Sequence, residues 1–341
     1  GIEHKLGIHA SPTCTMIFGD GKFGDEAGAI GWLIGEENRG LNCMFTMMNN
    51  ARLAVGVQGV AVAEAATQRA TAYANERKQG KAIGASGEGM SPIVLHPDVQ
   101  RNLLTMKSLT RAARAICYSC AHALDMAKIG SDEDRKFWVE RASLLTPIAK
   151  SFSTDIGSEV ASMGVQVHGG MGFVEETGAA IFMRDARIAQ IYEGTNGIQA
   201  IDLVLRKLPL SEGESIVSYF NELDGIIESL RASNRPEFGT AVKVLSEAMD
   251  DLRAATKWFE VKKSAGEMQA VLAAATPYQS LFGLTIGGVY LAKSALVDAS
   301  DERAALCRYF AENHVNGSGA LRARVECGAD SFSAAAAALV S

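Results

Sequence analysis

Apolar and polar positions alternate with the period of an α-helix over most of this chain. Apolar residues recur three and four positions apart in five runs of the first two thirds. The runs cover residues 41–78, 98–129, 135–163, 182–188 and 198–205. Short polar or proline-bearing connections separate them, and long helices joined in this way are typical of an antiparallel four-helix bundle. We therefore predict a helical bundle over residues 41–208.

The first 40 residues follow a different pattern. Residues 13–18 and 30–35 are short β-branched or aromatic runs, separated by turns rich in glycine and aspartate. This pattern predicts two strands with a broad turn between them. A hairpin without further strands is marginal in water, and the sequence opens at Gly1 without a methionine. We interpret the chain as one that lacks an N-terminal part.

A change of composition after Pro209 marks a boundary, followed by a second set of helical runs. We predict helices at 214–232, 237–264 and 267–299, with weaker segments beyond them. Residues 333–340 are rich in alanine, which occupies 334–338, and the sequence shows no repeat of fixed period. Residues 209–341 therefore form a helical extension without a recognisable chemical motif, and the fold class is mainly α.

Composition and charge exclude several classes of protein. Of 341 residues, 48% are hydrophobic, which fits a globular rather than a disordered chain. The net charge is −6, and no basic arm or stripe is present, so nothing points to nucleic acid. No apolar run approaches the roughly 20 residues of a membrane span. The six cysteines are scattered, which favours free thiols in a cytoplasmic protein.

Several common catalytic arrangements find no support in the sequence. Cys117 and Cys120 have the CxxC spacing, but they fall in the middle of a predicted helix without a second pair. We interpret them as buried thiols rather than as metal ligands. The six histidines are dispersed, and neither HExxH nor GxSxG occurs. No metal site is predicted.

A glycine-bearing break at residues 191–199 separates two helical runs and carries one carboxylate, Glu193. Tyr192 precedes this carboxylate, and Gly194 follows it. Glycine allows unusual backbone angles and the close approach of a ligand, so the break can present Glu193 to a pocket. A carboxylate beside a helix start is also commonplace, because it interacts favourably with the helix dipole. The residues alone leave both interpretations open.

Three further positions have a functional and a structural interpretation. Residues 166–173 contain paired glycines, which suit close approach to a phosphate or a flat ring, or else a helix cap and turn. Arg77 ends the first long helical run, either as a phosphate clamp or as favourable charge at a helix C-terminus. Arg52 lies in a run of apolar and small residues, where an ion pair is the usual explanation.

Taken together, these segments resemble the acyl-CoA dehydrogenase family. Residues 191–199 resemble the segment that bears the catalytic base in that family. The other matching segments are 5–7 with 11–13, 73–80, 166–173 and 183–187. The resemblance covers residues 1 to about 206. The tail is similar to the extension of a longer subgroup, which includes 3-methylthiopropionyl-CoA dehydrogenase-like proteins.

The resemblance implies a fold, a reaction and partners. Residues 1–40 would be the end of an incomplete β-domain, 41–208 the four-helix-bundle C-terminal domain, and 209–341 a helical extension. The implied reaction is FAD-dependent α,β-dehydrogenation of an acyl-CoA, with Glu193 removing the α-proton while the β-hydride passes to flavin. The implied partners are electron-transfer flavoprotein as acceptor and further copies of the chain, in a homodimer or homotetramer.

The resemblance also assigns roles to individual residues. Those implied to hold FAD are Arg77, Gln166, Gly169, Gly170, Thr195 and Asn196, and those implied to contact the substrate are Asn49, Arg52, Tyr192 and Gly194. Some members of the family carry the base on the first long helix instead. Ala51 occupies that position here, which leaves Glu193 as the candidate. Gln79 and Gly197 depart from the residues that many members have.

Two other functions remain open. Because the family forms much of its flavin and substrate pocket from more N-terminal parts, we expect this chain alone to be nearly inactive. It could be a catalytically silent helical assembly module, although such a module needs neither Glu193 nor Arg77. It could also be an acyl-CoA oxidase, which reoxidises its flavin with oxygen.

Overall fold

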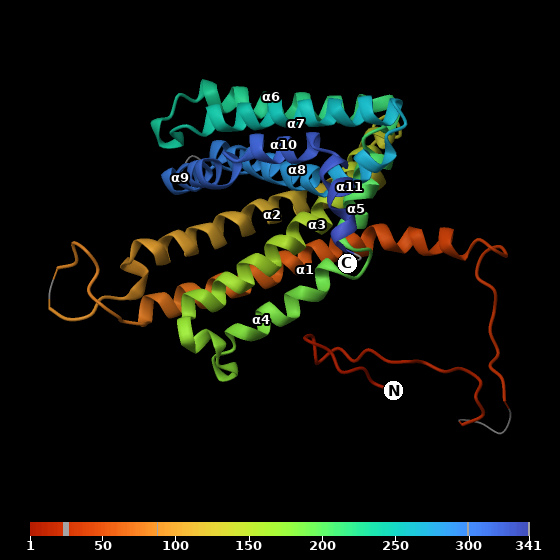
Figure 1. Cartoon of the computed structure of the whole chain (residues 1–341), viewed down its shortest axis with the longest axis horizontal. Coiled ribbons are helices and arrows are strands. Elements are labelled where there is room, and N and C mark those ends of the chain that lie inside the picture. Colours follow the sequence, from red (N-terminus) through yellow and green to blue (C-terminus); the bar gives the residue numbers. More distant parts are fainter. Residues whose placement is uncertain (23–26, 87, 299, 340–341) are drawn as a thin grey trace.

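The computed structural model describes residues 1–22, 27–86, 88–298 and 300–339, without the side chains of residues 45, 46, 49 and 337. Helices dominate it (Figure 1). The first group of helices consists of α1 (Gly40–Glu76), α2 (Pro97–Ile129), α3 (Arg135–His168), α4 (Ala179–Ala186) and α5 (Asn196–Asp202). The second group consists of α6 (Glu214–Ala232), α7 (Ala241–Ser264), α8 (Met268–Val297), α9 (Asp301–Phe310), α10 (Ser318–Glu326) and α11 (Asp330–Ala335).

The predicted helices are confirmed, with ends that differ by a few residues. The largest difference is in α3, which continues to His168 and contains Pro147 in its interior. Proline removes one backbone hydrogen bond from a helix and usually kinks it. Here Pro147 is buried, and its carbonyl oxygen accepts a hydrogen bond of 3.2 Å from Gln279 Nε2 of α8. This bond joins the two helix groups at the position of the proline.

Close contact between α1 and α3 builds the first helix group. Gly56 and Gly59 of α1 face the backbone of α3. A Cβ atom on Gly59 would lie 2.4 Å from the Ser153 carbonyl oxygen, and one on Gly56 would lie 2.5 Å from that of Ala149. Glycine is therefore required at both positions, since any side chain would push the two helices apart. This close approach brings the middle of α1 beside the middle of α3.

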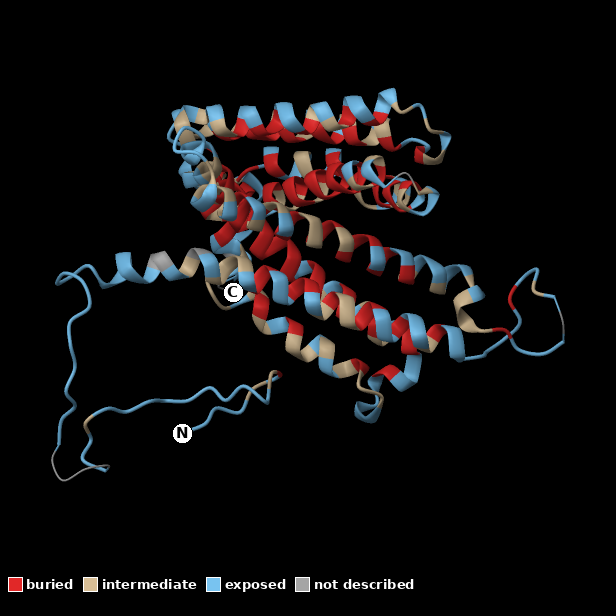
Figure 2. Ribbon diagram, turned by 180° about the vertical axis from the view of Figure 1, so that it is seen from behind, coloured by how far each residue is buried: buried red, intermediate tan, exposed pale blue. Residues whose placement is uncertain are grey.

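The second helix group lies against the first, with α8 in the interior (Figure 2). Tyr219 of α6 and Tyr290 of α8 are buried, and their hydroxyl oxygens lie 2.7 Å apart.

Among the described helices, α8 alone has the length and apolar content to cross a membrane. Length and composition alone pick out this helix, which contains one charged residue, Lys293. However, 67% of its apolar window is buried in the protein, as in the core helix of a globular fold.

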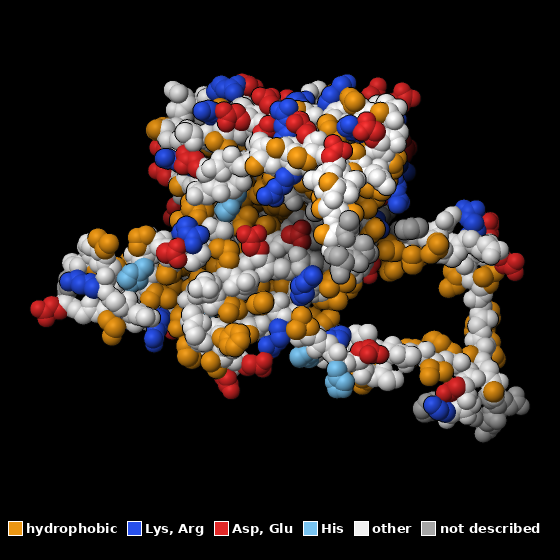
Figure 3. All heavy atoms as spheres, viewed as in Figure 1, with side chains coloured by type: hydrophobic (Ala, Val, Ile, Leu, Met, Phe, Trp, Pro, Cys, Tyr) orange, Lys and Arg blue, Asp and Glu red, His pale blue; other side chains and the backbone are white. Residues whose placement is uncertain are grey.

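The N-terminal segment is extended but forms no strand in the described parts of residues 1–39. Its single ladder contact is an isolated bridge between Ile2 and Cys14. The two predicted strands at 13–18 and 30–35 are therefore wrong for this structure. A strand needs a neighbour to pair its backbone groups, and Phe18 and Trp32 are 79% and 84% exposed. Figure 3 shows hydrophobic side chains along this uncovered arm.

Candidate functional site

Glu193 lies in a tight turn between a 3₁₀ segment, Arg187–Gln190, and α5. Its φ is 57°, and that of Gly194 is 83°, so both residues are left-handed. A non-glycine residue in this region is uncommon and costs on the order of 1 kcal/mol or more. Thr195 caps α5 by accepting a hydrogen bond of 3.4 Å from the Ile198 amide. Glu193 therefore precedes the helix cap and is not an ordinary first-turn carboxylate.

Lys150 of α3 lies beneath this turn with a completely buried side chain. Its Nζ donates a hydrogen bond of 2.7 Å to Asn196 Oδ1. Burial lowers the pKa of Lys150 to about 8, and the charge of Arg52 lowers it too, while the carboxylates of Asp155 and Glu193 act in the opposite direction. The carboxylate of Glu193 is thus within electrostatic reach of a buried amine.

Asn196 is held by α3 on several sides. Its Nδ2 lies 2.9 Å from Thr154 Oγ1 and 2.7 Å from Asp155 Oδ1. Gln190 Nε2 donates a hydrogen bond of 2.6 Å to the same Asp155 oxygen. The amide of Asn196 is therefore engaged within the protein. The network ties both ends of the Glu193 turn to α3.

Arg52 and Tyr192 place α1 beside the same turn. Arg52 Nη1 lies 3.8 Å from Asp202 Oδ2, and the two side chains are 12% and 6% exposed. This is the ion pair that the sequence left open for Arg52. The Tyr192 hydroxyl donates a hydrogen bond to Gln58 Oε1. The side chain of Asn49, also implied to contact the substrate, lies outside the described residues.

Two buried polar atoms near the turn have no hydrogen-bond partner in the described structure. They are Arg52 Nε and Gln199 Oε1. The other end of the Gln199 amide, Nε2, lies 3.3 Å from the Glu193 carbonyl oxygen. Buried polar groups are nearly always paired, so each of these atoms needs an explanation. A ligand group bound at the turn is one that the geometry allows.

A second cluster of implied site residues lies at the far ends of α1 and α3. The Tyr73 ring stacks on the His168 ring with centroids 4.4 Å apart, which brings these ends together. Arg77 follows Tyr73 by one turn, and Gln166 precedes His168; both side chains are exposed and make no hydrogen bond or ion pair with any described residue. The cluster also contains Gly169 and Gly170. A Cβ on either glycine would meet nothing within 4 Å.

The structure thus divides the implied residues between two places. Thr195, Asn196, Arg52, Tyr192 and Gly194 gather around Glu193, whereas Arg77, Gln166, Gly169 and Gly170 gather at the helix ends. Lys150 and Gln166 are 16 positions apart on α3, which corresponds to about 24 Å along the helix. One cluster therefore lies well away from the other along α3.

Lys150 and Gln199 were missed in the sequence, although a signal for Lys150 is present. It is the one charged residue in the run 142–154, whose other members are apolar residues, serines and threonines. Arg52 was noticed because of the same pattern. Gln199 gives no such signal, because a glutamine in a helical run is unremarkable.

The remaining sequence interpretations concern cysteines and metals. All six cysteines are free thiols, and Cys117 and Cys120 are buried, as expected. Burial raises the pKa of Cys117 to about 12 and that of Cys120 to about 11, which makes both thiols unreactive. Within the described part of the chain, no group of three or more His, Cys, Asp or Glu side chains could hold a metal ion.

Comparison with known families gives two matches along the chain. Residues 38–208 match the profile described as "Acyl-CoA dehydrogenase, C-terminal domain". Residues 219–336 match the profile described as "Acetyl-CoA dehydrogenase C-terminal like". The first match begins at the start of α1 and ends just after α5, so it includes both clusters.

Two curated relatives show the similarity in sequence. The chain is 45% identical over 254 residues to 3-methylmercaptopropionyl-CoA dehydrogenase of Ruegeria pomeroyi, covering 74% of this chain and 41% of that protein. It is 34% identical over 254 residues to a butyryl-CoA dehydrogenase of Syntrophomonas wolfei, covering 73% of this chain and 40% of that protein. The chain thus spans well under half the length of these relatives.

Two solved structures share the fold. One is a crystal structure of Caenorhabditis elegans ACDH-11 in complex with C11-CoA, with a TM-score of 0.74 and 21% identity over 97% of this chain and 54% of that one. The other is an acyl-CoA dehydrogenase of Bacillus anthracis complexed with FAD, with a TM-score of 0.73 and 22% identity over 95% of this chain and 56% of that one. At this identity the likeness concerns the fold alone.

Proposed function

We propose, from the premise that this chain belongs to the acyl-CoA dehydrogenase family, that it serves the oxidation of an acyl-CoA thioester between Cα and Cβ. The observation that carries the proposal is the left-handed turn that holds Glu193 above the buried Lys150. A backbone kept in a costly conformation by a surrounding network is a common feature of functional sites. The chain covers 41% of its first relative, so the activity of a whole protein of that length is itself part of the proposal.

Glu193 is proposed as the general base. The Cα–H bond breaks with its proton moving to the Glu193 carboxylate, and its electron pair forms the Cα–Cβ double bond as hydride leaves Cβ. FAD, when bound, supplies the acceptor for that hydride. The positive charge of Lys150 interacts favourably with the ionised Glu193, which is the form that accepts a proton.

The residues present fit a flavin nucleotide. At the far ends of α1 and α3, Arg77 offers a guanidinium that no described group occupies, beside the open backbone of Gly169 and Gly170. A free guanidinium with accessible backbone suits a pyrophosphate. Gln166 would join this contact. Thr195 and Asn196 would lie beside the flavin at the other cluster, where Asn196 is already fixed by α3.

We assign the substrate side of the site to the residues around Glu193. Arg52 and Gln199 each leave a buried polar atom without a described partner there, and Tyr192 and Gly194 flank the base. Asn49 precedes Arg52 by about one helical turn on α1. An acyl-CoA thioester offers both hydrogen-bond acceptors and donors to such a set. Its acyl chain length is not specified by these contacts.

The separation of the clusters supports a proposal about assembly. About 24 Å along α3 divides the Arg77 cluster from the turn. We propose that the Arg77 cluster holds the flavin that serves a second copy of the chain, in a homodimer or homotetramer. We propose an electron-transfer flavoprotein as electron acceptor on the family resemblance alone.

The test assays the protein at full length with FAD and a panel that includes 3-methylmercaptopropionyl-CoA and butyryl-CoA. Enoyl-CoA formation with a dye or electron-transfer flavoprotein as acceptor is expected. Glu193→Gln should lower kcat/KM by about 10²- to 10⁴-fold. The matched control is Glu302→Gln on the exposed surface of α9, which should not change kcat/KM.

The other outcomes decide between the alternatives. Full activity of Glu193→Gln would refute the assigned base. Oxygen consumption without an added acceptor would identify an oxidase. A colourless protein that cannot take up FAD and turns over none of the substrates would identify a helical assembly module.

A further inference from the structure

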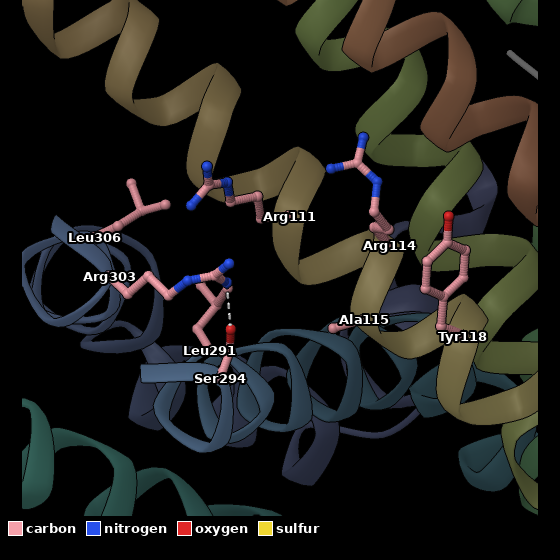
Figure 4. Close-up of a pocket in the computed structure, with 8 residues that line it drawn as sticks. All are labelled: Arg111, Arg114, Ala115, Tyr118, Leu291, Ser294, Arg303 and Leu306. Carbon is pink, nitrogen blue, oxygen red and sulfur yellow. Dashed lines mark hydrogen bonds between the residues drawn. The ribbon is translucent and has the colours of Figure 1, made fainter. Parts of the chain in front are cut away.

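A cavity of about 380 Å³ lies where α2 meets α8 and α9 (Figure 4). Arginine side chains from two sides of the cavity line it, namely Arg111 and Arg114 from α2 and Arg303 from α9. Leu291 of α8 and Leu306 of α9 form part of its wall and are each 7% exposed. None of these residues belongs to the two clusters around Glu193 and Arg77. The volume lies within the range of small-molecule sites.

Two of the three guanidinium groups already have a carboxylate partner. Arg114 Nη2 lies 2.6 Å from Glu64 Oε2 of α1. Arg303 pairs through Nε with Asp298 and donates a hydrogen bond of 2.7 Å from Nη1 to Ser294 Oγ. Each of these guanidinium groups has further N–H donors that these contacts do not use. The ion pairs therefore hold both side chains at the cavity and leave N–H groups that can bind a ligand.

Arg111 differs from both, because it makes no hydrogen bond or ion pair with any described residue. Its charge reaches Glu64 only at longer range. Burial alone would raise the pKa of Glu64, but hydrogen bonds from Arg114 and Gln68 and the charges of Arg114 and Arg111 lower it overall. Three guanidinium groups therefore face two carboxylates, Glu64 and Asp298. The cavity retains one uncompensated positive charge.

The arrangement selects for the shape of the anion as well as for its charge. In Figure 4, Arg111 from α2 and Arg303 from α9 extend into the same space. A carboxylate has two coplanar oxygens, which match a single guanidinium fork. A phosphoryl group has three acceptor oxygens and can accept from guanidinium groups on two walls at once. The apolar wall strengthens these contacts by lowering the local dielectric constant.

We propose that this cavity binds a small organic phosphate, with its phosphoryl group between Arg111 and Arg303 and its remaining part against Leu291 and Leu306. This site is separate from the proposed dehydrogenation and does not depend on it. It joins the first helix group, through α2, to the second, through α8 and α9. A bound ligand would therefore contact both groups.

Calorimetric titration of the purified protein with ADP, at fixed ionic strength, tests the proposal. ADP is expected to bind, and Arg111→Gln should weaken it by about 10- to 100-fold, the loss typical of one charge-assisted contact. Arg101→Gln is the matched control. Arg101 lies on the same helix and is exposed, and among the described residues its side chain pairs with Asp98 alone, so this variant should bind like the wild type.

Further arms identify the recognised group. Competition by inorganic phosphate would show that the site recognises the phosphoryl group. Equal affinity for ADP and for inorganic phosphate would identify free phosphate as the ligand. Succinate competing as well as phosphate would overturn the assignment. So would absence of ADP binding at millimolar concentration, or equal binding by Arg111→Gln and Arg101→Gln. If Arg111→Gln does not fold, Arg111→Lys keeps the charge without the fork and should still weaken ADP binding.

Discussion

Lys150 and Asn196 are joined by a hydrogen bond of 2.7 Å that ties the start of α5 to the interior of α3. Asn196 lies three residues after Glu193, and the side chain of Lys150 has no exposed surface. A buried amine without a partner would be strongly unfavourable. The Glu193 turn supplies that partner, so the position of the turn and the burial of the lysine depend on each other.

Replacement of Lys150 should reveal its burial through the pH dependence of stability. Below about pH 8 the amine is charged in both the folded and the unfolded chain, so burial of the charge destabilises the folded state to its full extent. Between about pH 8 and its ordinary value of 10.5, the unfolded chain binds the proton and the folded protein does not. The free energy of unfolding should thus rise with pH, relative to Lys150→Met, by about 2 kcal/mol between pH 7 and 10.

Urea unfolding of both proteins at several pH values measures this difference. Comparison with a variant is necessary because the buried cysteines, whose pKa values are raised, act in the opposite direction at high pH. Lys128→Met, at an exposed position on α2, is the control and should show no such trend. A constant difference between wild type and Lys150→Met across this range would contradict the burial of a titrating amine.

His314 should make the protein sensitive to acid. Burial lowers the pKa of His314 from 6.5 to about 4. As the pH falls from 6.5 to 4, the unfolded chain binds the proton and the folded protein does not, so stability is lost. Between pH 7.5 and 4.5, the free energy of unfolding of His314→Gln should therefore rise by about 1–2 kcal/mol relative to that of the wild type, after allowance for the partial exposure of His314.

The measurement is chemical unfolding followed by circular dichroism at pH 7.5 and 4.5. The control is His4→Gln in the exposed N-terminal segment. If both variants lose stability in parallel with the wild type, His314 is not the group responsible.

The two helix-facing glycines of α1 give a prediction about packing. Gly59→Ala would place a Cβ 2.4 Å from a carbonyl oxygen of α3, so the helices must separate. We expect a loss of about 1–3 kcal/mol, although alanine is intrinsically the better helix former. Gly225→Ala in α6 is the matched control, since its Cβ meets nothing within 4 Å. It should stabilise the protein by about 0.5–1 kcal/mol. Thermal unfolding distinguishes this expected gain from the expected loss in Gly59→Ala.

Local periodicity explains which parts of the fold could be predicted from sequence. Helix hydrogen bonds join residues four apart, so the patterns at 98–129 and 214–232 were sufficient to place α2 and α6 nearly to the residue. The runs at 13–18 and 30–35 also carry a local pattern, one typical of strands, yet they form none. A strand depends on a neighbour that no local pattern reveals.

The site shows the same limit. Glu193 could be singled out because its glycine-bearing break is local in sequence. The ion pair of Arg52 joins residues 150 positions apart, at 52 and 202, and the contact of Lys150 with Asn196 joins residues 46 positions apart. No spacing rule connects such pairs. The lone cation in an apolar run showed that Arg52 needs a partner, but not which one.

The turn itself offers the sharpest test of the candidate site, because two of its glycines differ in geometry. Gly194 has a φ of 83°, and a Cβ there would lie 2.8 Å from Gln199 Nε2, which contacts the Glu193 carbonyl oxygen. Gly194→Ala should therefore displace Glu193 with only a modest loss of stability. A displacement on the order of 1 Å can lower kcat/KM by about 100-fold.

Gly197→Ala is the matched control, three residues further along in α5. Its backbone is ordinary helix, and an added Cβ would meet nothing within 4 Å. We expect kcat/KM to stay within about twofold of the wild type, because alanine suits a helix. Both variants are assayed at full length, with thermal unfolding in parallel. Equal activity in the two would show that the left-handed turn does not position the base, since only Gly194→Ala disturbs it.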